Sequence, residues 1–301
     1  SIQAPRQRHR AIAVPEAKQG ARFGHDGLFI CWDLLNGSGP TTLGRMATAR
    51  QVGRIRWQAW CMGLCCIAVF CGYSDGAAAQ ATRDAALAKR YADCMSLARS
   101  TPTKAIGIAA KWEREGGDEG ARHCTAVALL NTGEYEEAAR RLESLAATSR
   151  RPGKSLKAEL LAQAGQAWLI AGKPTEALSA QTRALKLAGP ETELLLDRAI
   201  TRASVGDYWE AIDDLNRAID GDSRRVDALT YRATAWRKLK NLDLAYDDIA
   251  RAVEIAPTNT DALLERGNIH LLRGDKAGAA ADWRAVIGVD AKSPAADAAR
   301  D

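Results

Sequence analysis

From Gln80 onward the sequence has few of the residue types that catalytic and metal sites need. Residues 80–301 contain two cysteines, Cys94 and Cys124, and two histidines, His123 and His270. Their spacing matches no metal-binding motif. His123 and Cys124 are adjacent, but neighbouring side chains on a helix point about 100° apart, so we do not expect a catalytic pair. This scarcity argues against an enzyme or a metal protein, and we expect no cofactor.

The same part of the chain lacks a net charge and a strand-like pattern. Residues 80–301 hold 33 basic residues (42 less 9) and 33 acidic residues (37 less 4), so the formal charge of +5 belongs to residues 1–79. A neutral body argues against nucleic acid as a partner. No run of alternating apolar and polar residues is present, and the abundance of Ala, Leu, Arg and Glu predicts helices throughout.

Residues 46–79 have the order of features typical of a secretory signal peptide. Three arginines are followed by an apolar run over 59–73 and then by three alanines that end at Ala79. The run is shorter than the roughly 18 residues expected of a membrane-spanning helix. This length favours cleavage near Ala79, with an uncleaved anchor in the inner membrane as the alternative. We therefore expect a periplasmic or secreted protein that does not contact the membrane after cleavage.

Residues 1–45 precede Met46, where a signal peptide of this kind would begin. We interpret them as an upstream extension or a mis-set start and expect them to be disordered. Whether they are translated stays open.

A pattern that repeats at a constant interval governs the chain from Ala158 onward. Four segments of equal length, 158–191, 192–225, 226–259 and 260–293, align without a gap. Their eighth place holds Gly or Ala and their twentieth holds Ala, which indicates two helices that touch at small side chains. Because a unit of this size is too small to bury a core alone, the period predicts a stacked array of helical hairpins.

The array extends upstream in a less regular form. Residues 119–152 carry small residues and a turn glycine at the same places and predict one more repeat. Residues 80–118 predict a degenerate N-terminal pair, with helices over 81–99 and 103–115. Residues 294–301 are expected to be a short C-terminal tail.

These hairpins resemble the tetratricopeptide repeat. The family's large eleventh residue is present as Trp168 and Trp236, and its closing proline as Pro257, whereas Arg202 and His270 depart from the pattern. The resemblance, to an exported bacterial type, implies an all-α fold, a right-handed α-solenoid. It also implies a scaffold for protein or peptide binding in the cell envelope or periplasm. The alternative is a structural spacer of an envelope complex that binds through its convex face or its ends; the partner and the oligomeric state stay open.

The resemblance further implies that the second, fifth, ninth and twelfth places of each first helix line a concave groove. This groove would have acidic edges and an apolar centre at Leu196 and Ile200. The candidate partner-binding residues are Glu159, Gln166, Glu193, Leu196, Ile200, Asp227, Thr230, Thr234, Arg237, Asp261, Leu264 and Asn268. The acids at the second place have another explanation, because a carboxylate in the first turn complements the helix dipole.

Arginine and aspartate recur together at the seventh and twenty-third places of three repeats. This recurrence predicts one structural ion pair per hairpin, although a row of ligand-binding arginines is the alternative. The predicted pairs are Arg198 with Asp214, Arg232 with Asp248, and Arg266 with Asp282.

Cys94 and Cys124 lie on first helices of consecutive pairs, so in an oxidising compartment we predict a disulfide between them. The alternative is two small buried thiols. Trp209 stands at the eighteenth place, where a polar residue is usual, and either covers a neighbouring turn or marks a contact site.

Overall fold

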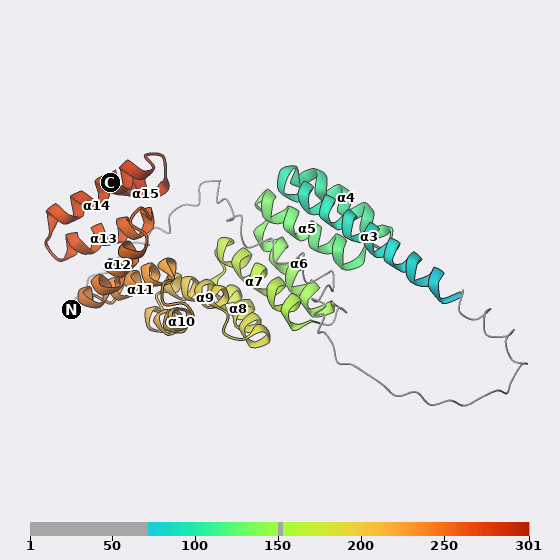
Figure 1. Ribbon diagram of the computed structural model, residues 1–301, viewed down its shortest axis with the longest axis horizontal. Coiled ribbons are helices and arrows are strands. Elements are labelled where there is room, and N and C mark those ends of the chain that lie inside the picture. The colour runs from blue at the N-terminus through green and yellow to red at the C-terminus, as the bar shows by residue number, and fades with distance from the viewer. Residues whose placement is uncertain (1–71, 150–152, 301) are drawn as a thin grey trace, which may run out of the picture. The chain divides into compact units, whose positions relative to one another are not determined.

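The computed structural model describes residues 72–149 and 153–300, and within them every regular element is a helix, thirteen in all (Figure 1). This confirms the predicted all-helical class. The helices are α3 (Gly72–Ser100), α4 (Pro102–Arg114), α5 (Asp118–Thr132), α6 (Tyr135–Thr148), α7 (Lys154–Ile170), α8 (Pro174–Ala188), α9 (Thr192–Val205), α10 (Tyr208–Gly221), α11 (Val226–Lys238), α12 (Leu242–Ile255), α13 (Thr260–Leu272), α14 (Lys276–Val289) and α15 (Pro294–Arg300).

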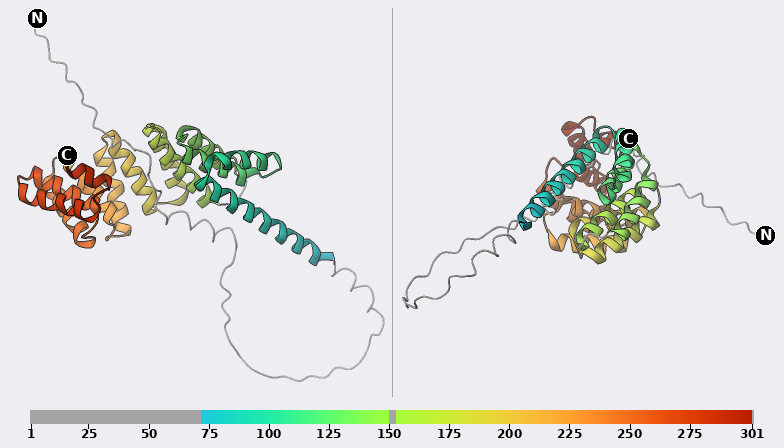
Figure 2. Two further views of the ribbon diagram at one scale, coloured as in Figure 1. Left: turned by 90° about the horizontal axis from the view of Figure 1, so that it is seen from above. Right: turned by 90° about the vertical axis from the view of Figure 1, so that its right-hand side faces the viewer.

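Short turns fold these helices into hairpins that follow one another along the chain (Figures 1 and 2). In five hairpins, α5–α6 to α13–α14, the fifteenth place of the repeat adopts a left-handed backbone. Glycine, which has no Cβ to clash, occupies that place in four of them, for example Gly206 with φ of 90°. Lys240 takes it in the α11–α12 hairpin with φ of 64°. The turn geometry is thus fixed by the repeat even where the glycine is missing.

Each hairpin packs on the next, and the core consists largely of alanine and leucine. The residue at the eighth place is buried and small, and it packs against a larger side chain at the twenty-fourth place. Gly165 faces Gln181, and Gly267 faces Trp283, whose ring nitrogen would lie 2.5 Å from an added Cβ. The other two repeats have Ala at the eighth place and Leu or Ile at the twenty-fourth. The small residue at the eighth place therefore leaves room for the side chain at the twenty-fourth place, so the two helices of a hairpin pack closely.

Helix α3 begins at Gly72, before the predicted start at residue 81. The end of the predicted signal peptide, 72–79, forms its first turns. Residues 46–71 of that segment and the predicted extension 1–45 lie outside the described residues. Among the helices that the structure describes, none is both long and apolar enough to cross a membrane.

Residues 294–300 of the predicted short C-terminal tail form helix α15. Pro294 suits the first position of a helix, and Ser293 Oγ accepts a hydrogen bond of 3.1 Å from the Ala296 backbone nitrogen. Ala295 and Ala296 join the same apolar cluster as residues of α13 and α14. The tail therefore covers the last hairpin.

Candidate functional site

The twelve candidate groove residues lie on the first helices α7, α9, α11 and α13. Glu193 and Asp261 are exposed. Half-buried positions are held by Glu159, Gln166, Ile200, Asp227, Thr234, Arg237, Leu264 and Asn268.

Leu196, which was predicted at the apolar centre of the groove, is buried, and Thr230 at the same place of the next repeat is also buried. Leu196 is 4% exposed and belongs to a core cluster with Ile219 and Leu229 of the following helices. Thr230 is 8% exposed, and its hydroxyl donates to the Val226 carbonyl within its own helix. Successive first helices contact one another, and in these two repeats the side chain at the fifth place is buried.

The sixth place, which the sequence did not single out, connects one first helix to the next. Gln166 of α7 donates from Nε2 to Asp197 Oδ2 of α9 at 2.9 Å. Arg237 of α11 donates to both carboxylate oxygens of Glu265 of α13, at 2.6 and 3.0 Å. His123 of α5 lies 3.2 Å from Gln163 of α7. These residues are 28 to 40 positions apart, so a comparison of equivalent places in the repeats does not reveal them.

Five residues of α9, α11 and α13 form what we name the acidic patch: Glu193, Asp197, Asp227, Tyr231 and Asp261. Burial raises the pKa of Tyr231, and the negative charges of Asp261, Asp227 and Asp197 raise it further. The tyrosine, 42% exposed, therefore lies among carboxylates of three consecutive first helices.

The negative charge of this patch is offset in part by Arg225. Its guanidinium contacts Glu193 at 2.6 Å and Asp227 at 2.7 Å and so links α9 to α11. Asp261 and Asp197 form no ion pair with a described residue.

Burial disfavours the charged form of Asp197 in the acidic patch. Burial raises the pKa of its carboxyl to about 6, and the charge of Glu193 adds to the rise, while the hydrogen bond from Gln166 opposes it. The folded state thus binds this proton more tightly than the unfolded chain. The contribution of Asp197 to the free energy of unfolding therefore falls as the pH rises from 3.8 to about 6, because the unfolded chain releases the proton while the folded state still holds it.

The three arginine–aspartate pairs lie inside the hairpins. Arg198 donates from Nε and Nη2 to the two oxygens of Asp214 at 2.8 and 2.7 Å. Arg232 and Arg266 bind their aspartates in the same two-pronged geometry. Arg202 adds a contact of 2.6 Å to Asp214, so an apparent departure from the repeat pattern belongs to this ion-pair cluster. Because Arg198, Arg232 and Arg266 are each bound to an aspartate, they do not form a row of unpaired arginines for a ligand.

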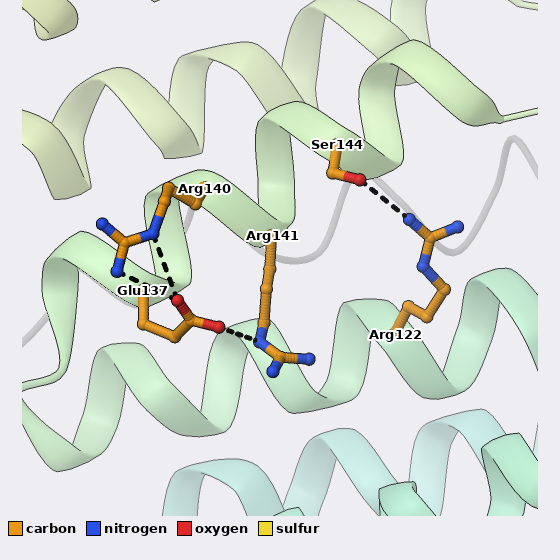
Figure 3. A pocket seen from close by; sticks show the side chains of 5 residues that line it. All are labelled: Arg122, Glu137, Arg140, Arg141 and Ser144. Carbon is orange, nitrogen blue, oxygen red and sulfur yellow. Dashed lines mark hydrogen bonds and ion pairs between the residues drawn. The ribbon is translucent and has the colours of Figure 1, made fainter.

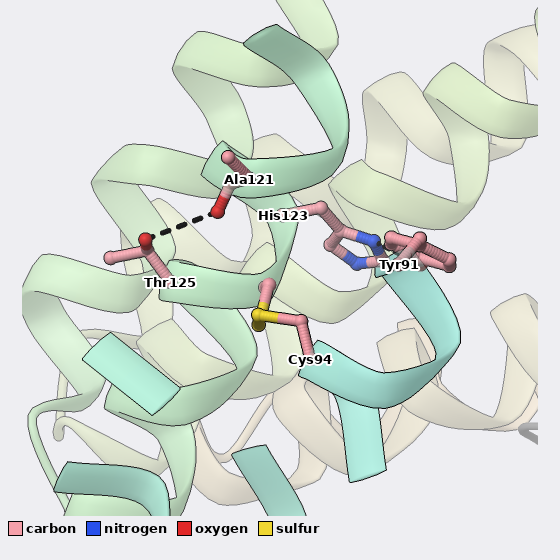
Figure 4. Close-up of a disulfide and its surroundings, with 6 residues drawn as sticks. Tyr91, Cys94, Ala121, His123 and Thr125 are labelled. Atoms are coloured by element: carbon pink, nitrogen blue, oxygen red, sulfur yellow. Dashed lines mark hydrogen bonds between the residues drawn. A yellow bond between two sulfur atoms is a disulfide. The ribbon is translucent and has the colours of Figure 1, made fainter. Parts of the chain in front are cut away.

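The N-terminal helices are held together by a disulfide between Cys94 of α3 and Cys124 of α5 (Figure 4). Beside it the Tyr91 and His123 rings stack, and Tyr91 Oη lies 2.7 Å from His123 Nδ1. Burial lowers the pKa of His123. Because Cys124 is bonded to Cys94, it has no free thiol that could react together with His123, so these two adjacent residues have a structural role.

Trp209 is 62% exposed and lies edge-on against Trp236, with ring centroids 5.5 Å apart. Trp209 therefore packs against Trp236 and leaves most of its own side chain exposed.

The α5–α6 hairpin carries a cavity of about 310 Å³. Among the described residues, His, Cys, Asp and Glu form no group suited to a metal ion.

Comparison with known proteins agrees with this fold. No model of a known protein family matches the chain. The chain is similar to Protein unc-45 homolog B of Danio rerio, with 31% identity over 104 residues, which are 33% of this chain. The chain spans about 11% of the length of the curated relatives it matches.

Among solved structures, the chain is similar to MamA, residues 41 to the end, from Desulfovibrio magneticus RS-1. The identity is 19%, the match covers 59% of this chain and 98% of MamA, and the TM-score is 0.51. It is also similar to YrrB, a TPR protein with an unusual peptide-binding site, at 18% identity over 66% of this chain and 97% of YrrB, with a TM-score of 0.47. At 19% identity the likeness to MamA concerns the fold alone.

Proposed function

We propose that this tetratricopeptide-repeat protein is a scaffold that binds a cationic segment of a partner protein on its acidic patch. The observation that carries the proposal is the exposed Tyr231 ring among carboxylates from three consecutive first helices. Arginine and lysine side chains bind carboxylates, and they also bind the face of an aromatic ring. A partner segment lying across α9, α11 and α13 would place basic side chains at successive repeats.

The direct test uses a fluorescently labelled peptide of lysine, arginine and alanine, and a second peptide in which glutamate replaces the basic residues. The double variant Asp227→Asn with Asp261→Asn is expected to weaken binding of the basic peptide roughly tenfold, because two carboxylates are neutralised. Fluorescence anisotropy measures the affinity.

The matched control carries Asp213→Asn with Asp247→Asn. Both aspartates are exposed on the second helices α10 and α12, so the net charge changes equally. If this control loses as much affinity as the patch variant, the attraction is non-specific and the patch is not the binding site.

The affinity should also depend on pH, because the pKa of Asp197 is raised to about 6. Below that pH Asp197 is neutral, so lowering the pH from 7.5 to 5 is expected to weaken binding of the basic peptide roughly three- to tenfold. Asp197→Asn should remove most of this dependence, whereas a pH profile that the substitution leaves intact contradicts a role for Asp197.

Export to the cell envelope is a further part of the proposal, and the order of features in residues 46–79 supports it. N-terminal sequencing of the protein from a periplasmic or culture fraction is expected to begin at Gln80. Recovery of the mature protein with Ser1 still attached would rule out both the cleavage and the interpretation of residues 1–45.

The alternative is a spacer subunit that binds outside the acidic patch, and the exposed Trp209 on α10 favours it. Affinity capture from an envelope extract separates the two functions. Partners that are retained by the Asp227→Asn and Asp261→Asn variant and lost by Trp209→Ala support the alternative.

A further inference from the structure

The α5–α6 hairpin carries a cavity of about 310 Å³ that is lined by three arginines, one serine and one glutamate (Figure 3). Arg122 comes from α5, whereas Arg140, Arg141, Ser144 and Glu137 come from α6. The lining therefore carries three guanidinium groups and one carboxylate. The cavity lies outside the acidic patch, on a different hairpin.

The three arginines differ in how their charge is compensated. Arg140 binds Glu136 at 2.5 Å and Glu137 at 3.0 Å, so two carboxylates compensate its charge. Arg141 donates only from Nε, to Glu137 at 2.7 Å, and its two terminal amino groups have no partner among the described residues. Two donor groups of this guanidinium are thus available to a ligand.

Arg122 has no carboxylate partner among the described residues. Its two terminal amino groups donate to hydroxyl oxygens, to Thr148 Oγ1 at 3.1 Å and to Ser144 Oγ at 3.2 Å. Thr148 in turn donates to the Ser144 carbonyl at 2.8 Å. The Ser144 hydroxyl accepts from Arg122, and its own hydrogen has no described acceptor. A half-buried cation and a free hydroxyl donor therefore face the same cavity.

Arg122 and Arg141 stand at places that the regular repeats fill with other residues. The twenty-third place, which holds aspartate in three of the four regular repeats, is occupied here by Arg141. The fourth place, which is leucine in the four regular repeats, is occupied by Arg122. The seventh place holds Thr125, whose hydroxyl binds the Ala121 carbonyl. This hairpin therefore has arginines at the fourth and twenty-third places and no Arg–Asp pair between the seventh and twenty-third, and none of its described carboxylates forms an ion pair with Arg122.

We propose that this cavity binds a phosphate monoester. A phosphate dianion presents three acceptor oxygens to separate donors, and guanidinium groups are suited to binding it. The terminal amino groups of Arg141, those of Arg122 and the hydroxyl of Ser144 supply such donors from two facing helices. Glu137 orients Arg141 and remains bound to it. The phosphate could belong to a phosphorylated side chain of a partner or to a free small molecule.

Isothermal titration calorimetry on the full chain in a low-salt buffer tests the proposal with three probes: inorganic phosphate, O-phospho-L-serine and acetate. Saturable binding of both phosphate probes is expected, with acetate at least about tenfold weaker, because it presents two oxygens and one charge. Tighter binding of phosphoserine than of inorganic phosphate identifies a phosphorylated side chain as the source, and equal binding identifies a free anion.

Arg122→Gln and Arg141→Gln are each expected to raise the dissociation constant for phosphate by roughly tenfold or more. Arg141 is exposed, so its replacement keeps the test valid if Arg122→Gln unfolds the hairpin. The control is Arg284→Gln, which removes an equal charge from α14, where Arg284 binds only the Ala280 carbonyl of its own helix among the residues that the structure describes.

The proposal is overturned if phosphate does not bind saturably, if acetate binds equally well, or if Arg284→Gln has the same effect as Arg141→Gln. The acidic-patch variant Asp227→Asn with Asp261→Asn should bind phosphate as the unaltered protein does. Failure of one site is therefore distinguishable from failure of the other.

Discussion

Replacing Asp214 with alanine is expected to lower the free energy of unfolding by about 3–5 kcal/mol. The Asp214 side chain is 2% exposed and binds both Arg198 and Arg202. Without this carboxylate, two largely buried guanidinium groups lose their counter-ion and cannot recover their hydration. Urea unfolding followed by circular dichroism in the far ultraviolet measures the change.

Asp213→Ala is the matched control, because Asp213 is the preceding residue on α10 and is exposed. Its effect should stay within about 0.5 kcal/mol. A loss of similar size in both variants would show that the ion-pair cluster does not stabilise the stack. Hydrogen exchange should place the largest loss of protection in α9 and α10, because each repeat contacts only its neighbours.

Replacing both Cys94 and Cys124 with alanine is expected to lower the free energy of unfolding of the N-terminal helices by roughly 3–4 kcal/mol. The disulfide joins residues 30 positions apart, so its loss frees a long loop in the unfolded chain. The effect should be local, because α3 lies at the end of the array of hairpins and the other stacked contacts remain.

Reducing agent gives an independent measurement of the same bond. The unaltered protein should lose stability on addition of dithiothreitol, whereas the double alanine variant should not respond. Equal denaturation midpoints for the unaltered protein, with and without dithiothreitol, would contradict a stabilising disulfide. A limited protease digest should cleave α3 first in the reduced protein.

Much of the architecture could be predicted from the repeat period. The helices α9, α11 and α13 begin at Thr192, Val226 and Thr260, which are the first places of their repeats. The spacing of 16 residues between Arg198 and Asp214 crosses one hairpin turn, and the two side chains are in contact. Such local features follow from sequence because they depend on one hairpin with a fixed register.

The candidate site could be predicted less well, because it depends on contacts between hairpins. Leu196 occupies a place of the repeat that predicts a groove residue, yet it is buried in a core cluster with residues of the following helices. The contact between Gln166 and Asp197 spans two repeats at an offset that differs from the period. Polar residues at the sixth place, different in each repeat, are the signal in the sequence that could have indicated this network.

By itself the sequence determined that this protein is a stack of helical hairpins, since a constant repeat period with small side chains at fixed places permits close packing in one register. Only the tertiary structure decided which polar side chains remain available to a ligand. Burial of Leu196, the raised pKa of Asp197 and the lack of a carboxylate partner for Arg122 among the described residues all depend on contacts between helices. A repeat pattern describes each hairpin, whereas exposure and charge compensation depend on what the neighbouring helices place beside it.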